Sequence, residues 1–403
     1  MVVVDLSSAS ILKSPELPPS LVAPITSPLS TFVRPYSIED KRVSECAYVL
    51  FAQNDLSSDE CRVIKILREY KDTRYDLSTS DRRQRCQLEA LLRNRTFSPE
   101  AYIGLAPVIE LDLDRGFVGI GEVIEDPTRE LLDPDREYAL LMHRLPEDRR
   151  LDYLLEETNS ASLRSHIRIL TEHIANLHNH CSSPVSYDQE GMQWGSYEQL
   201  YNKLQHNLAL LDLVAETNKH GNPGHAQCYS ENLNHLKATL LHVFNQEHYR
   251  NYFEQRMRNG WIRLCHGDLK SPNIWILPGD DSHNCAPTQQ VKILDAIDFN
   301  PSYCNVDILS DFAMLAIDVE ARAKLTLANK MIDDYLTLTG QDNDISRLVL
   351  GYYLVEKAIV GAGISILYDN LPEFGLRLLE VATARLEVLQ AMQPASQYCG
   401  FGT

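Results

Sequence analysis

The spacing of apolar residues along this chain of 403 residues changes near Pro146, from a pattern typical of strands to one typical of helices. Before that proline the apolar residues form short β-branched and aromatic runs, as at 46–51 and 62–67, which are typical of strands. After it they recur every three or four residues on one helical face, at Leu163, Ile167, Leu170, Ile174 and Leu177. Strands followed by helices predict an α+β fold with two lobes, a small β-rich N-lobe and a larger helical C-lobe.

Local signals place the individual elements. The polar loop 54–59 lies between two strand-like runs and predicts a hairpin over 46–67. Serines and a threonine at 78–80 are candidate caps for a helix near 79–95. Further strands are expected near 106–111, 117–124, 137–142, 274–277 and 291–294. Two or three helices are expected across 196–257, and more from 307 to 393.

The first 35 residues differ in composition from the rest. They hold six of the 19 prolines, whose fixed φ angles and missing N–H groups oppose both helix and sheet. We therefore predict a flexible or extended arm at 1–35, with a docking peptide as the alternative. The N-lobe is then expected over 36–145 and the C-lobe over 146–396.

Charge and cysteine content restrict the partners and the compartment. With 38 basic and 56 acidic residues the formal net charge is −18, which repels nucleic acid, although a local pocket can still bind an anion. The nine cysteines form no CxxC pair, which is typical of free thiols in a reducing compartment. The first residues do not resemble a secretory signal, and no apolar run is long enough to span a membrane. A cytoplasmic protein with no membrane or nucleic-acid partner is expected, without a prediction of its oligomeric state.

The segment 264–274 (LCHGDLKSPNI) contains the most informative group of polar residues. Asp268 and Asn273 are five residues apart, directly before a predicted strand, so a tight loop can turn both side chains toward one cleft. A carboxylate at Asp268 can accept the proton of a hydroxyl group, and Asn273 offers a neutral oxygen for Mg²⁺. His266 is expected to pack beneath the loop and hold its backbone. This is the layout of the catalytic loop in kinase-like phosphotransferases.

A second carboxylate follows at the end of the next predicted strand. Asp295 ends the run 291–294 and is our preferred second ligand for Mg²⁺, with Asp298 as the competing candidate. Further on, Asp307 and Asp311 are four residues apart at a predicted helix start. They are either simple N-terminal carboxylates favoured by the helix dipole, or one of them braces the catalytic loop.

Several segments between residues 40 and 365 share one known pattern. They are His266–Asn273 (HGDLKSPN), Leu294–Asn300 (LDAIDFN), Asp307–Ala313, Phe253–Gly260, Tyr138–Arg149 and Leu170–His178. Together they resemble the aminoglycoside-phosphotransferase-like enzymes of the protein-kinase-like fold, and more narrowly a largely uncharacterised bacterial branch with HGDLHxxN and FDAIEFN motifs. The resemblance implies a small-molecule kinase with ATP as co-substrate and Mg²⁺ as metal.

The resemblance also implies roles for residues upstream. Lys65 precedes the segment 76–79 (DLST) as the family's nucleotide lysine precedes its DFST, and Glu89 lies in a segment similar to the family's acidic helix. Lys65 is thus expected to hold the ATP phosphates, with Glu89 orienting it. Without the resemblance, Lys65 is equally well interpreted as a charge that faces water on an edge strand. Glu89 is equally well interpreted as a residue on the solvated face of a helix. Lys270 replaces the branch's usual His and, as in protein kinases, is expected to touch the transferred phosphate.

Two departures keep other functions open. The hairpin 46–67 has no glycine, so cradling of phosphates by backbone N–H groups is in question. A pseudokinase, or nucleotide-binding scaffold without turnover, is therefore one alternative to a kinase that phosphorylates a hydroxyl of a small metabolite. A protein kinase is a second alternative, motivated by the sequence from His266 to Lys270, although no activation-loop segment is recognisable.

Overall fold

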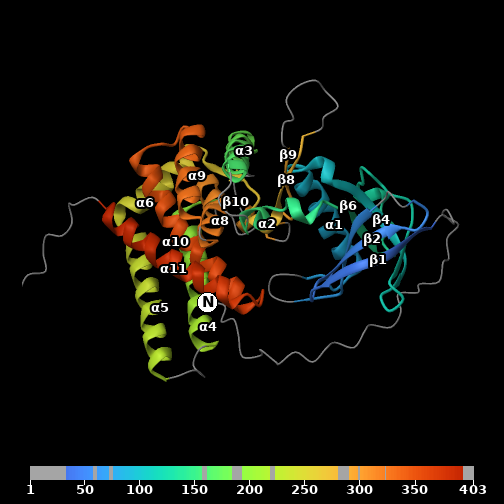
Figure 1. Ribbon diagram of the computed structural model, residues 1–403, viewed down its shortest axis with the longest axis horizontal. Helices are drawn as coiled ribbons and strands as arrows, with labels where there is room; N and C mark the ends of the chain where they lie inside the picture. The colour runs from blue at the N-terminus through green and yellow to red at the C-terminus, as the bar shows by residue number, and fades with distance from the viewer. Residues whose placement is uncertain are drawn as a thin grey trace, which may run out of the picture. The chain divides into compact units, whose positions relative to one another are not determined.

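The computed structural model describes most of the chain (Figure 1). The described residues are 33–57, 61–71, 76–156, 161–183, 193–217, 223–279, 290–297, 300–322 and 324–393. Residues 1–32 of the predicted arm and Asp298 lie outside the described residues.

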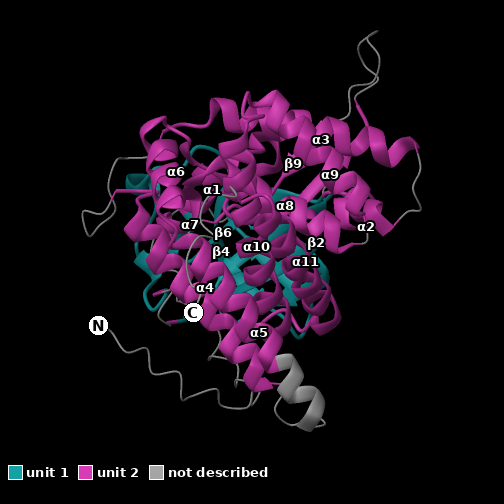
Figure 2. Cartoon of the chain, turned by 90° about the vertical axis from the view of Figure 1, so that its left-hand side faces the viewer, with its two compact units in different colours: residues 1–70, 77–87, 103–144 teal, residues 71–76, 88–102, 145–403 magenta. Residues whose placement is uncertain are grey.

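The chain forms two compact units of different composition (Figure 2). The first comprises residues up to 70 together with 77–87 and 103–144, and it contains most of the strands. The second comprises 71–76, 88–102 and the chain from 145 onward, and it is mainly helical. The predicted α+β fold, with a small β-rich part followed by a larger helical part, is confirmed.

A closed barrel forms the β-rich unit, with the strands in the order β1-β2-β3-β6-β4-β5. The strands are β1 (Arg34–Val43), β2 (Ala47–Asn54), β3 (Cys61–Leu67), β4 (Tyr102–Asp112), β5 (Phe117–Ile120) and β6 (Tyr138–His143). Alternate residues of β2 point inward, and Leu50 and Ala52 are fully buried there with Ile64 of β3. This alternation is what a strand with one face on the core requires.

Most of the barrel follows the sequence-based expectation. The hairpin predicted over 46–67 is present as β2 and β3, with Val49 opposite Lys65. The strands near 106–111, 117–124 and 137–142 are present as β4, β5 and β6, and β5 is shorter than predicted. Strand β1 was not predicted, because its sequence is largely charged and Tyr36 is the one residue of it that is buried. Pairing with β2 and β5, and not its own composition, makes this segment a strand.

Helix α1 (Ser80–Arg95) continues from the first unit into the second, close to the predicted range 79–95. In the first unit, Gln87 Nε2 donates to the backbone oxygens of Lys65 (2.9 Å) and Tyr138 (3.4 Å). These contacts tie the middle of the helix to β3 and β6, while the last two turns of the helix belong to the helical unit.

The helical unit contains the remaining helices and two short strand pairs. Its α-helices are α2 (Leu151–Glu156), α3 (Ala161–His180), α4 (Tyr197–Thr217), α5 (Pro223–Phe244), α6 (Glu247–Arg258), α7 (Pro301–Cys304), α8 (Ile308–Ala321), α9 (Leu325–Leu338), α10 (Asp344–Leu367) and α11 (Pro372–Ala391). Strand β7 (Ile262–Leu264) pairs with β10 (Asn305–Asp307), and β8 (Ile274–Leu277) pairs with β9 (Gln290–Ile293). Short 3₁₀ helices occur at Pro99–Ala101, Arg129–Leu131, Glu147–Arg149 and Ser271–Asn273.

Helix α10 forms the centre of this unit and contacts α4, α8 and α11. Among the described residues it is the one helix long and apolar enough to cross a membrane, but 72% of its most apolar window is buried within the structure. Helix α8 is buried along its whole length, so its polar residues must find partners inside the protein. Two of these residues lie beneath the loop described next.

Candidate active site

The loop between β7 and β8 brings three predicted site residues together. Asn273 Nδ2 donates to the backbone oxygen of Asp268 (2.9 Å) and to its Oδ2 (3.1 Å). Lys270 Nζ lies 3.0 Å from the same Oδ2. Burial disfavours the charged form of Lys270, but the neighbouring Asp268 carboxylate outweighs it and raises the pKa of the lysine. The side chains of Asp268 and Lys270 keep 25% and 31% of their surface exposed, so both can reach a substrate.

His266 lies on the buried side of the loop, as predicted. Its Nδ1 accepts the N–H of Asp268 (3.3 Å), so its Nε2 carries the proton and donates to the backbone oxygen of Leu294 (3.0 Å). Burial lowers the pKa of His266, which favours the neutral ring that this pattern needs. The edge-to-face contact with Phe97, at 5.1 Å between ring centres, completes its packing. His266 therefore links this loop to the end of β9.

Asp311 braces the loop through its buried carboxylate. It accepts the N–H of Gly267 at Oδ1 (2.7 Å) and the N–H of His266 at Oδ2 (3.2 Å). His178 Nε2 donates to Oδ2 as well (3.1 Å). Burial opposes the charged form, but these donors outweigh it, and the pKa of Asp311 is lowered. Of the two alternatives left open by the sequence, Asp311 is the loop brace.

Asp307 has a different role, although it is one helical turn away. Its side chain caps α8 by accepting the N–H of Leu309 (2.9 Å) and forms a two-point ion pair with the buried Arg256. Arg256 Nη2 lies 2.8 Å from Asp307 Oδ1. Asp307 thus anchors the start of the helix that presents Asp311.

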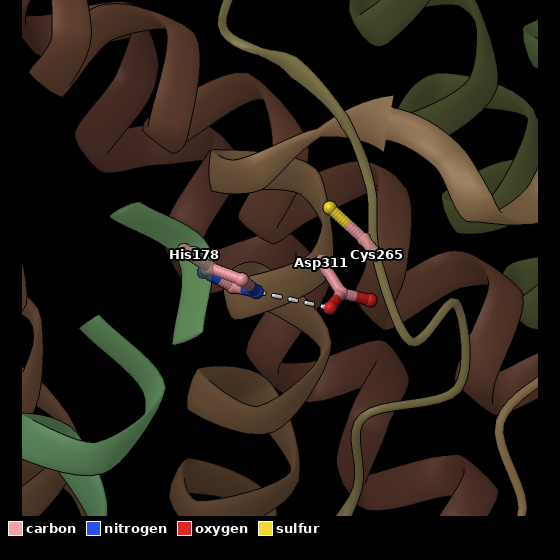
Figure 3. A group of neighbouring side chains, drawn as sticks. All are labelled: His178, Cys265 and Asp311. Atoms are coloured by element: carbon pink, nitrogen blue, oxygen red, sulfur yellow. Dashed lines mark hydrogen bonds and ion pairs between the residues drawn. The ribbon is translucent and has the colours of Figure 1, made fainter. Parts of the chain in front are cut away.

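His178, Cys265 and Asp311 also have the residue types of a metal site (Figure 3). Their potential ligand atoms lie within 4.8 Å of one another, and all three residues are buried. Both ring nitrogens of His178 are already engaged, Nε2 by Asp311 and Nδ1 by the Tyr335 hydroxyl at 2.6 Å. Burial raises the pKa of Cys265 well above its usual value, which keeps the thiol protonated. Cys265 Sγ donates to the backbone oxygen of Val306 (3.7 Å), so the three side chains have hydrogen-bond partners within the protein and need no ion.

Asn273 and Asp295 have the donor atoms that Mg²⁺ prefers. Because Asp268 accepts from Nδ2 of Asn273, the amide is oriented and its Oδ1 is left as an oxygen donor. The N–H of Leu294 donates to the backbone oxygen of Asn273 (2.8 Å). This hydrogen bond brings the backbone of Asp295, the next residue, close to Asn273. Asp295 is exposed and has a φ of 64°, in the left-handed region that non-glycine residues seldom adopt. Such outliers cluster at functional sites, where they aim a side chain.

Lys65 and Glu89 belong to different units. Lys65 is half-buried in the middle of β3, opposite Leu140 of β6, and Glu89 is exposed on α1. The pairing of these two residues stays a prediction, as does the choice between Asp295 and Asp298.

Sequence reasoning missed several residues that hold the site. Asp318 lies on the same face of α8 as Asp311, two turns further along the helix. It accepts the N–H of Ser271 (3.1 Å). A signal was available, because isolated carboxylates in the apolar run 308–321 must be buried with partners. Asp369, after α10, is a further carboxyl near the loop: burial and Asp268 raise its pKa, and Lys270 opposes them. No pattern in the sequence indicated that residue.

Comparisons with known proteins gave structural neighbours only. No protein-family model matches the chain, and neither does any curated protein. The chain is similar to choline kinase from Cryptosporidium parvum Iowa II (11% identity, TM-score 0.46, 89% of this chain and 88% of that chain). It is also similar to a choline/ethanolamine kinase family protein from Mesorhizobium loti (11%, 0.38, 89% and 89%). A third neighbour is the ADP-bound aminoglycoside phosphotransferase APH(2'')-Ib (11%, 0.39, 87% and 95%). The function proposed below rests on the contacts of the loop and not on these similarities.

Proposed function

We propose that this protein is an ATP- and Mg²⁺-dependent phosphotransferase that transfers the γ-phosphate to a hydroxyl group of a small molecule. The observation that carries the proposal is the contact between Asp268 and Asn273, which orients the amide and leaves its oxygen for a metal. Phosphoryl transfer requires mainly positioning and neutralisation of charge. This one loop supplies a proton acceptor, a metal ligand and the cation of Lys270.

The transfer step assigns a role to each atom. Asn273 and Lys270 both contact Oδ2 of the Asp268 carboxylate, so Oδ1 can meet the acceptor hydroxyl. As the hydroxyl oxygen bonds to the γ-phosphorus, Asp268 accepts the proton, and the bond to the β–γ bridging oxygen breaks to release ADP. Lys270 offsets negative charge on the moving group. His266 positions the loop and takes no proton.

Mg²⁺ would be held by Asn273 Oδ1 and the Asp295 carboxylate, with Asp298 as the alternative, and would neutralise the phosphate oxygens. Lys65 would hold the phosphates and Glu89 would orient Lys65, as the sequence resemblance implies. We take the acceptor to be a small molecule and not a nucleic acid, which the net charge of −18 would repel. We place the protein in the cytoplasm, because free cysteine thiols are typical of a reducing compartment.

A nucleotide-binding scaffold without turnover is the second candidate. One specific observation favours it: strands β1, β2 and β3 and the turns between them contain no glycine, from Arg34 to Leu67. Glycines let backbone N–H groups approach phosphates closely, so their absence removes one common way of binding ATP.

Nucleotide binding and turnover, measured together, separate these functions. ATP with Mg²⁺ should raise the melting temperature, and ATP at 100 times its Kd should add about 2.7 kcal/mol to stability. Labelled ATP and a metabolite panel would then identify the acceptor. In Asp268→Asn we expect kcat to fall about 10²–10⁴-fold with the nucleotide Kd nearly unchanged. The exposed Asp212→Asn is the matched control.

Each other outcome has a definite meaning. Binding of Mg-ATP without transfer to any panel member would favour the scaffold, and transfer to protein acceptors would favour a protein kinase. No thermal shift with any nucleotide, in Mg²⁺ or Mn²⁺, would overturn the proposal.

A further inference from the structure

The end of β9, which presents Asp295, is held by side chains from another part of the helical unit. Three backbone N–H groups there donate to side chains of the segment 94–102. The N–H of Ile293 donates to Ser98 Oγ (2.8 Å), that of Asp295 to Tyr102 Oη (3.0 Å) and that of Ala296 to Asn94 Oδ1 (2.8 Å). All three side chains are at least 97% buried.

Asn94 and Tyr102 form a continuous relay. The Tyr102 hydroxyl accepts from Asp295 and donates its own proton to Asn94 Oδ1 (3.0 Å). Asn94 Oδ1 therefore receives two hydrogen bonds, from Tyr102 and from Ala296, and both of its lone pairs are used. Asn94 Nδ2 donates to the backbone oxygen of Ala90 on the same helix (2.9 Å), which fixes the amide orientation. The relay thus starts on a rigid helix and ends on the backbone of Asp295.

This relay meets the chain where its conformation is unfavourable. Asp295 has a φ of 64°. Strand β9 ends two residues before it, at Ile293, and its residues have ordinary strand conformations. A left-handed aspartate persists only where surrounding groups hold it. Hydrogen bonds on residues 293, 295 and 296 fix the backbone on both sides of this residue. They therefore decide the direction in which its Cβ and carboxylate leave the chain.

We propose that Asn94 and Tyr102 are positioning residues for the divalent metal: they hold Asp295 in its left-handed conformation and so aim its carboxylate at the ion. The proposal rests on the proposed function, in which Asp295 is a metal ligand. Neither residue touches the metal or the nucleotide in this role. Both act through the backbone of Asp295.

Tyr102→Phe tests the relay, because it removes one hydroxyl and keeps the ring in place. Its matched control is Tyr138→Phe, since the Tyr138 hydroxyl accepts the backbone N–H of Asp133 (3.0 Å) within the β-rich unit. A second variant, Asn94→Leu, removes both acceptor bonds at once. If Asn94→Leu does not fold, Tyr102→Phe alone decides the question.

The first measurement is hydrogen exchange of the Asp295 and Ala296 amides in nucleotide-free protein. We expect Tyr102→Phe to speed exchange there, and Tyr138→Phe to leave it unchanged. The second is the Mn²⁺ concentration needed for half-maximal ADP binding, followed by thermal shift. It should rise about tenfold in Tyr102→Phe, as for other partners that orient a metal ligand, while metal-saturated binding stays close to wild type.

The two measurements separate the possible failures. Unchanged exchange in Tyr102→Phe would overturn the relay. Faster exchange with an unchanged Mn²⁺ requirement would overturn the positioning role and leave a purely structural contact. A wild type that binds no ADP with Mn²⁺ would overturn the proposed function instead, and the exchange comparison would still decide whether the relay holds Asp295.

Discussion

The two sides of the loop 265–273 carry aspartates that are used in opposite ways. On the buried side, Asp311 and Asp318 are 2% and 4% exposed, and they accept hydrogen bonds from loop N–H groups. On the outer side, Asp268 is partly exposed and Asp295 is exposed. A buried carboxylate must use its lone pairs inside the protein, whereas an exposed one can keep an oxygen for a substrate or a metal. The same residue type therefore supports the loop on one side and is available for the proposed chemistry on the other.

The largest effect should follow removal of a buried carboxylate. Asp311→Ala leaves two loop N–H groups and His178 without their acceptor, and we expect a loss of about 3–5 kcal/mol in the free energy of unfolding. Urea unfolding measures this loss. Asp307→Ala is the matched control, because it should lose a similar amount by orphaning Arg256 without touching the loop.

Turnover then separates the two variants. At temperatures where both are folded, Asp311→Ala should reduce kcat far more than Asp307→Ala, because Asp307 acts on the loop only through the start of α8. If Asp311→Ala does not fold, Asp311→Asn replaces it. Equal kcat in the two variants would contradict the assignment of Asp311 as the loop brace.

Asp295→Asn should give the next largest effect, which is expected on the affinity for the metal ion and not on the free energy of unfolding. Replacing a charged ligand should raise the Mg²⁺ concentration for half-maximal nucleotide binding about 100-fold, the upper end of the range for residues that merely orient ligands. Thermal shift with ADP across a Mg²⁺ titration measures it. Asp298→Asn tests the competing ligand, and a larger effect from that variant would exchange the roles of the two aspartates.

Asp318→Leu should cost less than Asp311→Ala, because it orphans one backbone N–H, that of Ser271, and breaks an ion pair with the partly exposed Arg322 (3.4 Å). We expect a loss of about 1–3 kcal/mol in the free energy of unfolding. The exposed Asp344→Leu at the start of α10 controls for the change of residue type. A neutral result would show that Ser271 is satisfied in another way.

The smallest effect is expected at His173, whose Nε2 is buried without a hydrogen-bond partner. Burial lowers its pKa, with Lys292 adding to the shift and Glu100 opposing it. Below the ordinary pKa of 6.5 the unfolded chain binds the proton more readily than the folded one, so stability falls as the pH decreases. His173→Phe should remove this contribution, flatten stability between pH 7 and about 5, and add up to about 1 kcal/mol near pH 5. Urea unfolding at several pH values checks it, and an unchanged slope would place the proton uptake elsewhere, for example at His266.

Much of the fold could be predicted from the sequence because each signal was local. The hairpin 46–67, helix α1 and the helices beyond 307 follow from residue type and apolar spacing. Strand β1 could not be predicted in this way, since its charged sequence becomes a strand only by pairing with β2 and β5. The cap at Asp307 and the brace at Asp311 looked alike, because both are aspartates near one helix start.

The sequence by itself determined that Asp268, Lys270 and Asn273, the residues proposed to carry the chemistry, come together, because their spacing is short enough for one loop to hold all three. Only the tertiary structure decided what holds them. Asp311, Asp318, Asn94 and Tyr102 are 44 to 202 residues away from the backbone groups that they bind, as counted along the chain. Such contacts depend on how α1, the start of β4 and α8 pack against the loop and the end of β9, and residue spacing carries no information on packing between distant segments.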